Sequence, residues 1–296
     1  MARPDASDVT VVVVTWNALP WLEQCLDSVR GHELVVVDHG STDGTLDFVR
    51  EHHPGARIVE QENKGMGGGN NAGMRVAEGR YFFLLNSDAW VVGDGLEQLV
   101  AFADANPDTA VVGPRLRNTD GSLQRSVRGD PTLWRLATEY LFIRKLAPRT
   151  NALNPLYVGG FDHDRECEVD WLYGPALLVR RDATEQVGLF DEDFFMFSEE
   201  ADWMRRFRAA GWKVRFFPGA EVVHVGGASH GGRMYVENLR SHVRYAWKHR
   251  GPRAAERVRL LLLWSLRLRA LVLRRESYRE GIAFLSSGPA ETLLRK

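Results

Sequence analysis

The first part of the chain alternates between short apolar runs and segments with apolar residues at helical spacing. Val9–Val14 and Leu34–Val37 are unbroken runs of mainly β-branched residues. Such runs are typical of parallel strands that are buried on both faces. Between them, residues 19–29 carry leucine or valine at every third or fourth position, and Gly31 ends the segment. The pattern predicts a strand, a helix and a second strand.

The same unit recurs downstream. Residues 45–55 predict a helix that leads to a short strand near Ile58, and residues 70–79 predict a helix that leads to a strand at Tyr81–Leu85. This alternation predicts an α/β fold with a doubly wound, mostly parallel sheet and right-handed crossovers. Ligands of such sheets bind beyond the carboxyl ends of the strands.

Later segments extend this plan. Residues 95–105 predict a helix, residues 110–113 a strand, and Asp120-Gly121 the turn of a hairpin. Residues 130–168 combine a helical stretch at residues 133–146 with a long loop of the kind that is often mobile or faces substrate. The other expected elements are an apolar strand within 169–182, a helix that follows Ser198 and stops at Gly211, and two short strands within 214–224.

Composition narrows the class of protein. The 296 residues are 44% hydrophobic, which suits one large or two small globular domains, and a formal net charge of -1 gives no reason to expect nucleic acid as a partner. Cys25 and Cys167 are the only cysteines, so no disulfide framework is available and a reducing, cytoplasmic setting fits. The amino terminus does not resemble a secretory signal, and no apolar run is long enough to span a membrane.

Polar side chains follow the predicted strands, at the edge where such sheets bind ligands. Asn, Ser and Asp are also turn formers, so a turn is an equally simple explanation for most of them. Asp38 is harder to explain in this way, because it directly follows four apolar residues, and it is the better candidate for ligand contact. The residues at these strand ends are Thr15, Trp16, Asn17, Asp38, Asn86, Ser87 and Asp88.

The segment GMGGGNNAG at residues 65–73 raises the alternative of a dinucleotide-binding oxidoreductase. Its spacing partly matches a dinucleotide fingerprint, but that fingerprint belongs directly after the first strand, so an oxidoreductase is disfavoured. The glycines are expected to let the backbone pass close to a nucleotide or to the sheet, and Asn70 and Asn71 are expected to begin a helix. A metal site at His163 and Cys167 lacks further ligands and is discounted.

Two acidic residues and one histidine in the second half have alternative explanations. Glu199 and Glu200 would interact well with the macrodipole at a helix start, but their position directly after FFMF also suits a general base with a raised pKa. His224 ends a predicted strand. It is either a structural histidine whose ring nitrogens are hydrogen-bonded within the fold, or a functional residue.

Taken together and in order, the motifs VVTWN, VVVDHGSTDGT, NKGMGGGNNAG, LLNSDAWV, WLYGPALLVRR, GLFDEDFFMFSEEADW and VVH resemble the inverting nucleotide-sugar glycosyltransferases of family 2. Within that family they are most similar to bacterial rhamnosyltransferases of cell-wall and O-antigen assembly. The match extends from Val9 to about His230. The resemblance implies a GT-A fold, with a nucleotide half at about 1–113, an acceptor half at about 114–232 and a helical tail at 233–296.

The resemblance also assigns roles to residues. Asp88 matches the last position of the family's D-x-D motif and would bind Mg²⁺ or Mn²⁺ on the donor diphosphate, with His224 as a further metal ligand. Position 86 is Asn where the motif has Asp, and position 39 is His where Asn is common. The nucleotide sugar would be bound by Thr15, Trp16, Asn17, Asp38, Asn70, Asn86, Ser87 and Asp88.

By the same resemblance, Glu200 would be the base that deprotonates the acceptor hydroxyl, in a single displacement that inverts the anomeric carbon. Glu199 would support it, although a Glu-Glu pair in place of the usual Glu-Asp leaves the choice between them open. Trp171, Gly174 and Asp202 would contact the acceptor. The Gln-x-x-Arg-Trp motif of processive synthases is absent from the sequence, which favours the addition of one sugar.

The carboxyl-terminal region is strongly basic. Between residues 233 and 279, thirteen Lys and Arg residues face three Glu residues. The stretch RLLLLWSLRLRALVLRR predicts an amphipathic helix that lies on an anionic membrane surface, or one that packs on its own protein or in a homodimer.

The expected activity is transfer of one sugar, rhamnose from dTDP-rhamnose, to a glycan or lipid-linked acceptor at the inner face of the cytoplasmic membrane. The alternative is a nucleotide-sugar-binding protein or partner subunit without turnover, which Asn86 favours.

Overall fold

The computed structural model describes residues 8–226 and 232–294. It separates into two compact units. Unit 1 contains residues 8–127, 162–193 and 203–226, and unit 2 contains residues 128–161, 194–202 and 232–294. The expected boundaries near residues 113 and 232 follow the order of the chain, whereas the compact units group residues 128–161 with the carboxyl-terminal helices. The end of the family match, near His230, lies outside the described residues.

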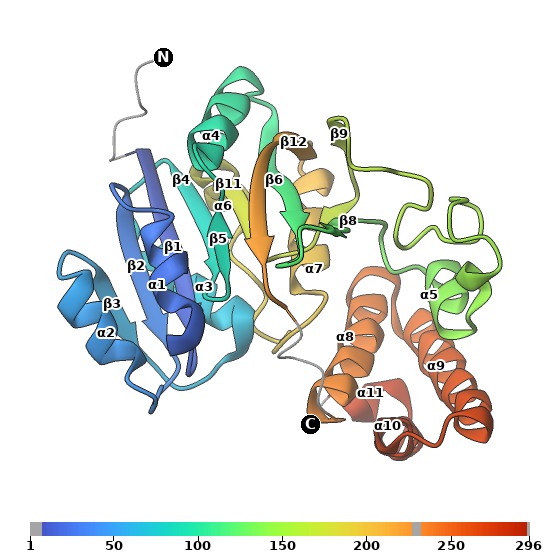
Figure 1. Ribbon diagram of the computed structural model, residues 1–296. Coiled ribbons are helices and arrows are strands. Elements are labelled where there is room, and N and C mark those ends of the chain that lie inside the picture. The colour runs from blue at the N-terminus through green and yellow to red at the C-terminus, as the bar shows by residue number, and fades with distance from the viewer. Residues whose placement is uncertain (1–7, 227–231, 295–296) are drawn as a thin grey trace. The chain divides into compact units, whose positions relative to one another are not determined.

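A ten-stranded mixed sheet forms the centre of unit 1 (Figure 1). The order β3-β2-β1-β4 is parallel throughout, β11 runs antiparallel to both β4 and β6, and β12 runs parallel to β6 and antiparallel to β5. The predicted mostly parallel α/β sheet is therefore confirmed. Its strands are β1 (Val9–Thr15), β2 (Glu33–Asp38), β3 (Arg57–Glu60), β4 (Tyr81–Asn86), β5 (Ala89–Val91), β6 (Thr109–Arg117), β7 (Leu123–Gln124), β9 (Cys167–Glu168), β11 (Ala176–Arg180) and β12 (Lys213–His224).

Helices cover both faces of this sheet, which explains why β1 has no polar alternation (Figure 1). Val11 and Val13 belong to a core cluster with Leu22 and Leu26 of α1, while Val12 and Val14 lie against α3 on the other face. The helices of unit 1 are α1 (Leu19–Asp27), α2 (Thr45–His52), α3 (Gly65–Val76), α4 (Gly95–Ala105) and α6 (Arg181–Val187), and α7 (Glu199–Ala209) begins in unit 2 and continues into unit 1.

The glycine-rich segment differs from the sequence expectation. The helix α3 begins at Gly65 and not at Asn70, so the glycines lie inside the helix. A Cβ atom on Gly69 would lie 2.7 Å from Cγ1 of Val14, and one on Gly73 would overlap Cγ1 of Val12. The glycines therefore allow α3 to pack directly on β1, which is the sheet-contact role that the sequence left open.

Two further expectations need correction. The pair of short strands expected within 214–224 is one long strand, β12, whose register to β6 shifts between Phe217 and Glu221. The helix expected from residue 133 ends at Tyr140, since Phe142 has a left-handed φ of 60°, and a short 3₁₀ helix follows at Ile143–Lys145. The predicted hairpin is confirmed, because β6 and β7 pair across Gly121, which has a φ of 80°.

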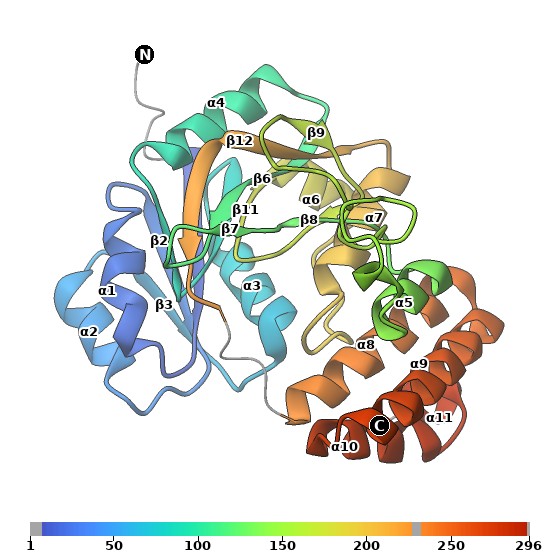
Figure 2. The same ribbon diagram turned by 45° about the vertical axis from the view of Figure 1, so that its right-hand side comes forward.

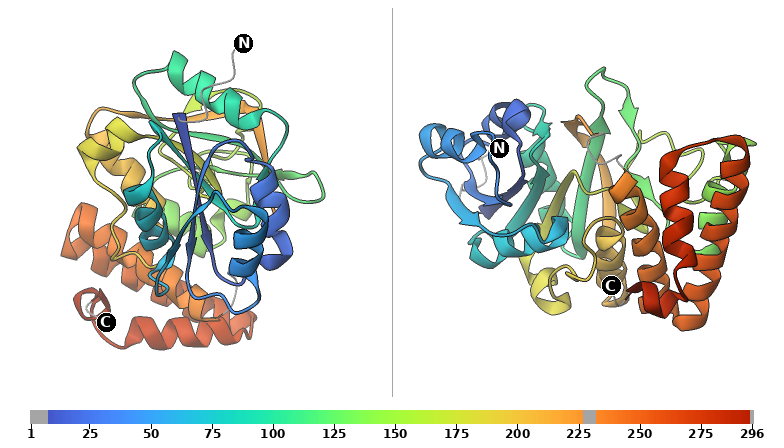
Figure 3. Two further views of the ribbon diagram at one scale, coloured as in Figure 1. Left: turned by 90° about the vertical axis from the view of Figure 1, so that its left-hand side faces the viewer. Right: turned by 90° about the horizontal axis from the view of Figure 1, so that it is seen from below.

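Unit 2 is a helical bundle. The helix α5 lies beside α9, and α8 lies beside α9 and α10 (Figures 2 and 3). Leu136 and Tyr140 of α5 share a buried cluster with Leu262 and Leu266 of α9. No helix among the described residues is both long and apolar enough to cross a bilayer. The helices of unit 2 are α5 (Leu133–Tyr140), α8 (Gly232–Arg250), α9 (Pro252–Val272), α10 (Glu276–Ser286) and α11 (Ala290–Leu294). Apart from the large sheet, β8 (Val127–Arg128) pairs with β10 (Trp171–Leu172), which belongs to unit 1.

Candidate active site

The polar residues at the strand ends lie along one edge of the sheet of unit 1. In the parallel register Thr15 pairs with Asp38, and Val14 pairs with Asn86. The edge expected from the sequence is therefore present for the first, second and fourth strands.

Asp38 holds the loop that follows β2. Its buried carboxylate accepts hydrogen bonds from the hydroxyls of Thr15 (2.8 Å) and Ser41 (2.5 Å), and from the amides of Gly40 (3.0 Å) and Ser41 (2.8 Å). An ionised carboxylate has about four acceptor positions, and those of Asp38 are used by three bonds from the loop and one from Thr15 of β1. Asp38 therefore stabilises a turn, a role that was harder to assign to it from the sequence. Direct ligand contact by Asp38 stays a prediction.

The loop after β1 is tied to the same structure. Asn17 has a left-handed φ of 51°, donates its amide to Oγ of Ser41 at 2.8 Å, and accepts from the amide of Thr42 through Oδ1 at 2.8 Å. Next to it, Trp16 is 62% exposed. An exposed aromatic ring on a fixed loop offers a face on which a nucleotide base can stack. The nucleotide-binding roles of Thr15, Trp16 and Asn17 thus stay predictions with a suitable geometry.

His39 lies close to the glycine-rich helix. A Cβ atom on Gly69 would lie 3.0 Å from Cε1 of His39, so only glycine leaves the ring this room. Burial lowers the pKa of His39, against an opposing effect of Asp38. The ring is therefore neutral at physiological pH and acts through hydrogen bonds, one of which joins Nε2 to Nε2 of Gln61 at 3.1 Å.

Asn70 and Asn71 are buried within α3. The side-chain amide of Asn71 donates to the carbonyl of Phe190 and accepts from its amide, both at 2.9 Å. Asn71 thereby fixes the segment that precedes the acidic pair. Nucleotide-sugar binding by Asn70 stays a prediction.

Asp88 and His224 come together where β4 and β12 end. Nε2 of His224 lies 3.3 Å from Oδ1 of Asp88, and the amide of Gly226 donates to Oδ2 at 3.1 Å. Burial by itself would raise the pKa of Asp88, but the hydrogen bond and charge of His224 and the Gly226 amide hold it below its ordinary value. Asp88 is therefore ionised at neutral pH. Ser87 and Asp88 form the turn between β4 and β5, so Ser87 also has its expected turn role.

Gln124 of β7 supports the histidine from behind. Its Oε1 lies 2.8 Å from Nδ1 of His224, and its Nε2 donates to Oδ1 of Asn118 at 2.8 Å. The second bond orients the amide with its oxygen toward the ring, so Nδ1 donates to Gln124 and Nε2 is the nitrogen that faces Asp88. Metal-binding histidines are held in this way by an acceptor on the other ring nitrogen. The sequence analysis missed Gln124, which is one hundred residues from His224.

These residues fit a divalent cation. A carboxylate oxygen and an imidazole nitrogen 3.3 Å apart supply two ligands on one side of an ion. Among the described residues, no group of three or more His, Cys, Asp and Glu side chains is arranged to hold a metal. The half-buried Asn86 adds no carboxylate to the set.

The turn between β10 and β11 lies next to this pair. The ring of Tyr173 meets the ring of His224 edge-on, with centroids 5.8 Å apart. Pro175 accepts a hydrogen bond from the amide of Asn86 through its carbonyl at 2.9 Å. Trp171 and Gly174 flank Tyr173, so their predicted acceptor contacts stay predictions with a suitable position. Tyr173 itself was missed, although its place between Trp171 and Gly174 is a usable signal.

Glu199 and Glu200 start α7 and belong to unit 2. Glu199 is 4% exposed, whereas Glu200 is half-buried. Burial raises the pKa of Glu199 well above its ordinary value, and the charges of Glu200 and Glu237 add to this effect. Glu199 is therefore protonated when Glu200 is ionised, and the two carboxyl groups share a hydrogen bond. Further along the same helix, Trp203, Met204 and Phe207 are fully buried.

Asp202 forms an ion-pair cluster within unit 2. Its fully buried carboxylate lies 2.8 Å from Nζ of Lys248 and 2.7 Å from Nε2 of His249, both on α8. This geometry favours a positioning role for Asp202 over the expected contact with the acceptor, which stays a prediction. Lys248 and His249 were missed, since only folding brings them to the acidic helix.

Comparison with known proteins agrees with this architecture. A profile described as "Glycosyl transferase family 2" matches residues 10–188. The chain is 32% identical over 299 residues to the N-acetylglucosaminyl-diphospho-decaprenol L-rhamnosyltransferase of Mycobacterium tuberculosis, and the alignment covers 92% of this chain and 94% of the relative.

Solved structures share the fold. The mannosyltransferase PcManGT from Pyrobaculum calidifontis, in complex with GDP-Man and Mn²⁺, superposes with a TM-score of 0.56 at 19% identity, over 99% of this chain and 88% of that one. GalNAc-T7 with UDP, GalNAc and Mn²⁺ gives a TM-score of 0.60 at 14% identity, over 98% of this chain and 56% of that one. With the expected GT-A fold present and both sequence comparisons in agreement, the chain belongs to glycosyltransferase family 2, whose members use nucleotide sugars and invert the anomeric carbon.

Proposed function

We propose that this glycosyltransferase adds one sugar, rhamnose from dTDP-rhamnose, to a hydroxyl of a lipid-linked glycan precursor in cell-envelope assembly. The mycobacterial relative, which is named for an L-rhamnosyl transfer to a decaprenol-linked acceptor, supports the choice of donor and acceptor. The observation that carries the proposal is the pair Asp88 and His224, whose 3.3 Å separation and whose orientation by Gln124 suit a divalent cation at the diphosphate end of a nucleotide sugar.

The donor would lie along the edge of the sheet in unit 1. Trp16 would stack on the base, and Asn17 and the loop held by Asp38 would form the wall around the ribose. Mg²⁺ or Mn²⁺ would be held by Asp88 and His224. When bound, the cation neutralises charge on the diphosphate and makes it a better leaving group.

The acidic pair in unit 2 would move the proton. Glu200 takes the proton of the acceptor hydroxyl while that oxygen forms a bond to the anomeric carbon, and the bond from this carbon to the diphosphate oxygen breaks. The nucleotide diphosphate leaves with the bonding electrons. Glu199, whose pKa is raised by burial and by the charge of Glu200, would keep its proton and donate a hydrogen bond to Glu200, which orients the base.

A membrane surface would bring the enzyme to such an acceptor. The outer face of α9 exposes Trp264 (63%), Leu268 (57%) and Leu271 (82%), and the exposed side chain of Arg267 stacks on Trp264 at 5.0 Å. An aromatic and leucine face with arginines beside it is typical of helices that lie in the headgroup region of anionic membranes. The enzyme would then act as a peripheral protein on the inner face of the cytoplasmic membrane.

Donor binding can be tested by a thermal-shift screen of nucleotide sugars with Mg²⁺ or Mn²⁺. A true donor at 100 times its dissociation constant adds about 2.7 kcal/mol of stability. The selected donor is then incubated with prenyl-linked N-acetylglucosaminyl diphosphate, and release of nucleotide diphosphate is measured. Release that depends on the acceptor excludes a binding protein without turnover, whereas binding without release would favour it.

A further inference from the structure

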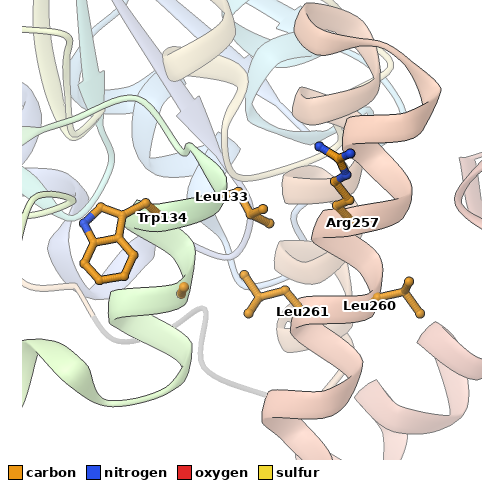
Figure 4. Close-up of a pocket in the computed structure, with 6 residues that line it drawn as sticks. Leu133, Trp134, Arg257, Leu260 and Leu261 are labelled. Carbon is orange, nitrogen blue, oxygen red and sulfur yellow. The ribbon is translucent and has the colours of Figure 1, made fainter.

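An open apolar groove runs between α5 and α9 in unit 2 (Figure 4). Its volume is about 460 Å³, within the usual range of sites for small ligands. Leu133 and Leu261 point toward one another across it (Figure 4). The lining residues are Leu133, Trp134, Ala137, Arg257, Leu260 and Leu261.

The walls of this groove are fixed by hydrogen bonds. Arg269 of α9 donates to the carbonyls of Tyr140 (2.7 Å) and Glu139 (2.8 Å), at the end of α5. The indole nitrogen of Trp134 donates to the carbonyl of Ala152 at 3.3 Å, which orients the ring. These bonds hold α5 against α9 and fix the ring of Trp134 at the groove.

The apolar lining is exposed and continues beyond the groove. Leu133 is 41% exposed and Trp134 is 53% exposed. On α9, Leu260 is followed by Trp264, Leu268 and Leu271 at intervals of four, four and three residues, which places all four on one face. This stripe extends the groove by about 16 Å along the helix, at about 1.5 Å per residue.

One end of the groove is positively charged. Arg257 lies one turn before Leu260 and Leu261, and among the described residues no carboxylate pairs with it. By contrast, the neighbouring Arg259 pairs with Glu256. The groove therefore offers an available cation at one end and an apolar path away from it.

We propose that this groove binds the isoprenoid chain of the lipid-linked acceptor, with Arg257 close to the diphosphate that joins the chain to the sugar. This inference rests on the proposed function and adds a binding site to it. A prenyl diphosphate matches this arrangement, because its anionic diphosphate can lie beside Arg257 and its long apolar chain can lie along the groove. A protein partner fits less well. Ordinary protein interfaces bury about 800 Å² on each side and involve about 20–30 residues of each partner, whereas the six lining residues form a much smaller surface.

Binding of farnesyl diphosphate to the full chain, below its micelle concentration, provides the test. The exposed positions Leu133 and Leu260 permit the double variant Leu133→Gln/Leu260→Gln without burial of new polar atoms. The control is Val92→Gln/Leu146→Gln, which changes two exposed apolar residues outside the groove. Calorimetry should give a Kd for farnesyl diphosphate that is at least about tenfold higher for the groove variant than for wild type, a loss of about 1.4 kcal/mol in binding free energy, and an unchanged Kd for the control. Arg257→Gln should also raise the Kd for farnesyl diphosphate. Equal affinity of the wild type and the groove variant would overturn the proposal.

Kinetics separate this site from the proposed function. Acceptors with the same sugar diphosphate but either a long prenyl chain or a short alkyl chain are compared. The groove variant should raise KM for the prenyl acceptor about tenfold and leave KM for the short acceptor unchanged. An equal rise for both acceptors would contradict the groove assignment. Failure of the wild type to turn over any acceptor, with farnesyl diphosphate still bound, would instead reject the proposed function.

Discussion

At the scale of single residues, the two adjacent glutamates differ in environment more than in chemistry. Glu199 is buried, and its Oε2 has no hydrogen-bond partner among the described residues, while Glu200 remains half-buried. Because two carboxylates in contact cannot both ionise easily, the buried one keeps the proton. This difference supports our proposal that Glu200 is the base, a choice that the sequence left open, and the assignment stays a prediction.

Substitution of each glutamate by glutamine tests this assignment. Glu200→Gln should lower kcat by about 10²- to 10⁴-fold, since the base is lost, while donor binding in the thermal-shift assay survives. Glu199→Gln keeps a hydrogen-bond donor of the same size and should keep kcat within about tenfold of wild type. The reverse ranking of the two variants would identify Glu199 as the base.

The raised pKa of Glu199 also predicts a pH dependence of stability. The folded protein keeps this proton above the ordinary glutamate range of about 4.3, whereas the unfolded chain releases it, so the free energy of unfolding falls as pH rises toward the raised pKa. Glu199→Gln removes the effect. Urea unfolding should therefore show a stability advantage of the variant that is small near pH 4 and grows toward pH 8. Parallel curves for the two proteins would contradict the burial argument.

The metal assignment gives a residue-scale prediction that involves Gln124. Asp88→Ala should abolish the part of donor binding that depends on Mg²⁺ or Mn²⁺. Gln124→Leu removes the acceptor on Nδ1 of His224 and should weaken metal affinity by about 10- to 100-fold, because the tautomer is no longer fixed. Donor titrations at several metal concentrations measure both effects. Thr119→Ala, at an exposed position of the same hairpin, serves as the control, and an equal loss in that variant would argue against a role of Gln124 in metal binding.

At the scale of elements, α3 shows how local composition and packing compete. Glycine is a poor helix former, and five of the first nine residues of α3 are glycine. The helix nevertheless forms from Gly65, because its glycines permit direct contact with Val12 and Val14 of β1. Tertiary packing therefore overrides the local preference that placed the helix start at Asn70.

Gly73→Ala should accordingly destabilise the protein by about 1–3 kcal/mol, since the added methyl group would overlap Val12. The matched control is Gly55→Ala, where a Cβ atom would meet nothing within 4 Å. That variant should be unchanged or slightly more stable, because alanine lowers the entropy of the unfolded chain. Denaturant unfolding compares the two variants, and similar midpoints would refute close packing of α3.

At the scale of the whole molecule, helix α9 of the basic tail has one buried apolar face and one exposed apolar face. The inner face of α9 packs in unit 2 through residues such as Leu262 and Leu266, which satisfies the expectation of packing on its own protein. The outer face keeps Trp264, Leu268 and Leu271 exposed. The helix thus keeps an exposed apolar surface after its own core is complete. Its proposed contact with a membrane and the expected homodimer both stay predictions.

Sedimentation with vesicles tests the outer face. Wild type should bind phosphatidylglycerol vesicles more strongly than neutral ones, and added salt should weaken binding, since each arginine near the surface contributes about 1 kcal/mol. Trp264→Ser/Leu268→Ser should lower binding, whereas Leu146→Ser, at an exposed position outside α9, should not. If the double variant instead converts a dimer to a monomer without a change in vesicle binding, the outer face is a protein interface.

The sequence by itself determined the features that depend on neighbours along the chain. The buried strands from β1 to β4, their polar carboxyl ends and the hairpin at Gly121 follow from short-range patterns of apolar and turn residues. Family motifs added the expected identity of Asp88, Glu200 and His224, because a metal and a base require particular side chains at strand and helix ends.

Tertiary structure alone decided what surrounds these residues. The bond from Gln124 to His224 joins positions one hundred residues apart, and Lys248 and His249 reach Asp202 only when α8 packs beside the start of α7. Contacts with distant segments likewise decide where α3 begins and why β12 is one continuous strand. Burial among such segments also raises the pKa of Glu199. Hydrogen-bond partners and desolvation depend on which residues come together when the chain folds, so they cannot be predicted from the local sequence pattern alone.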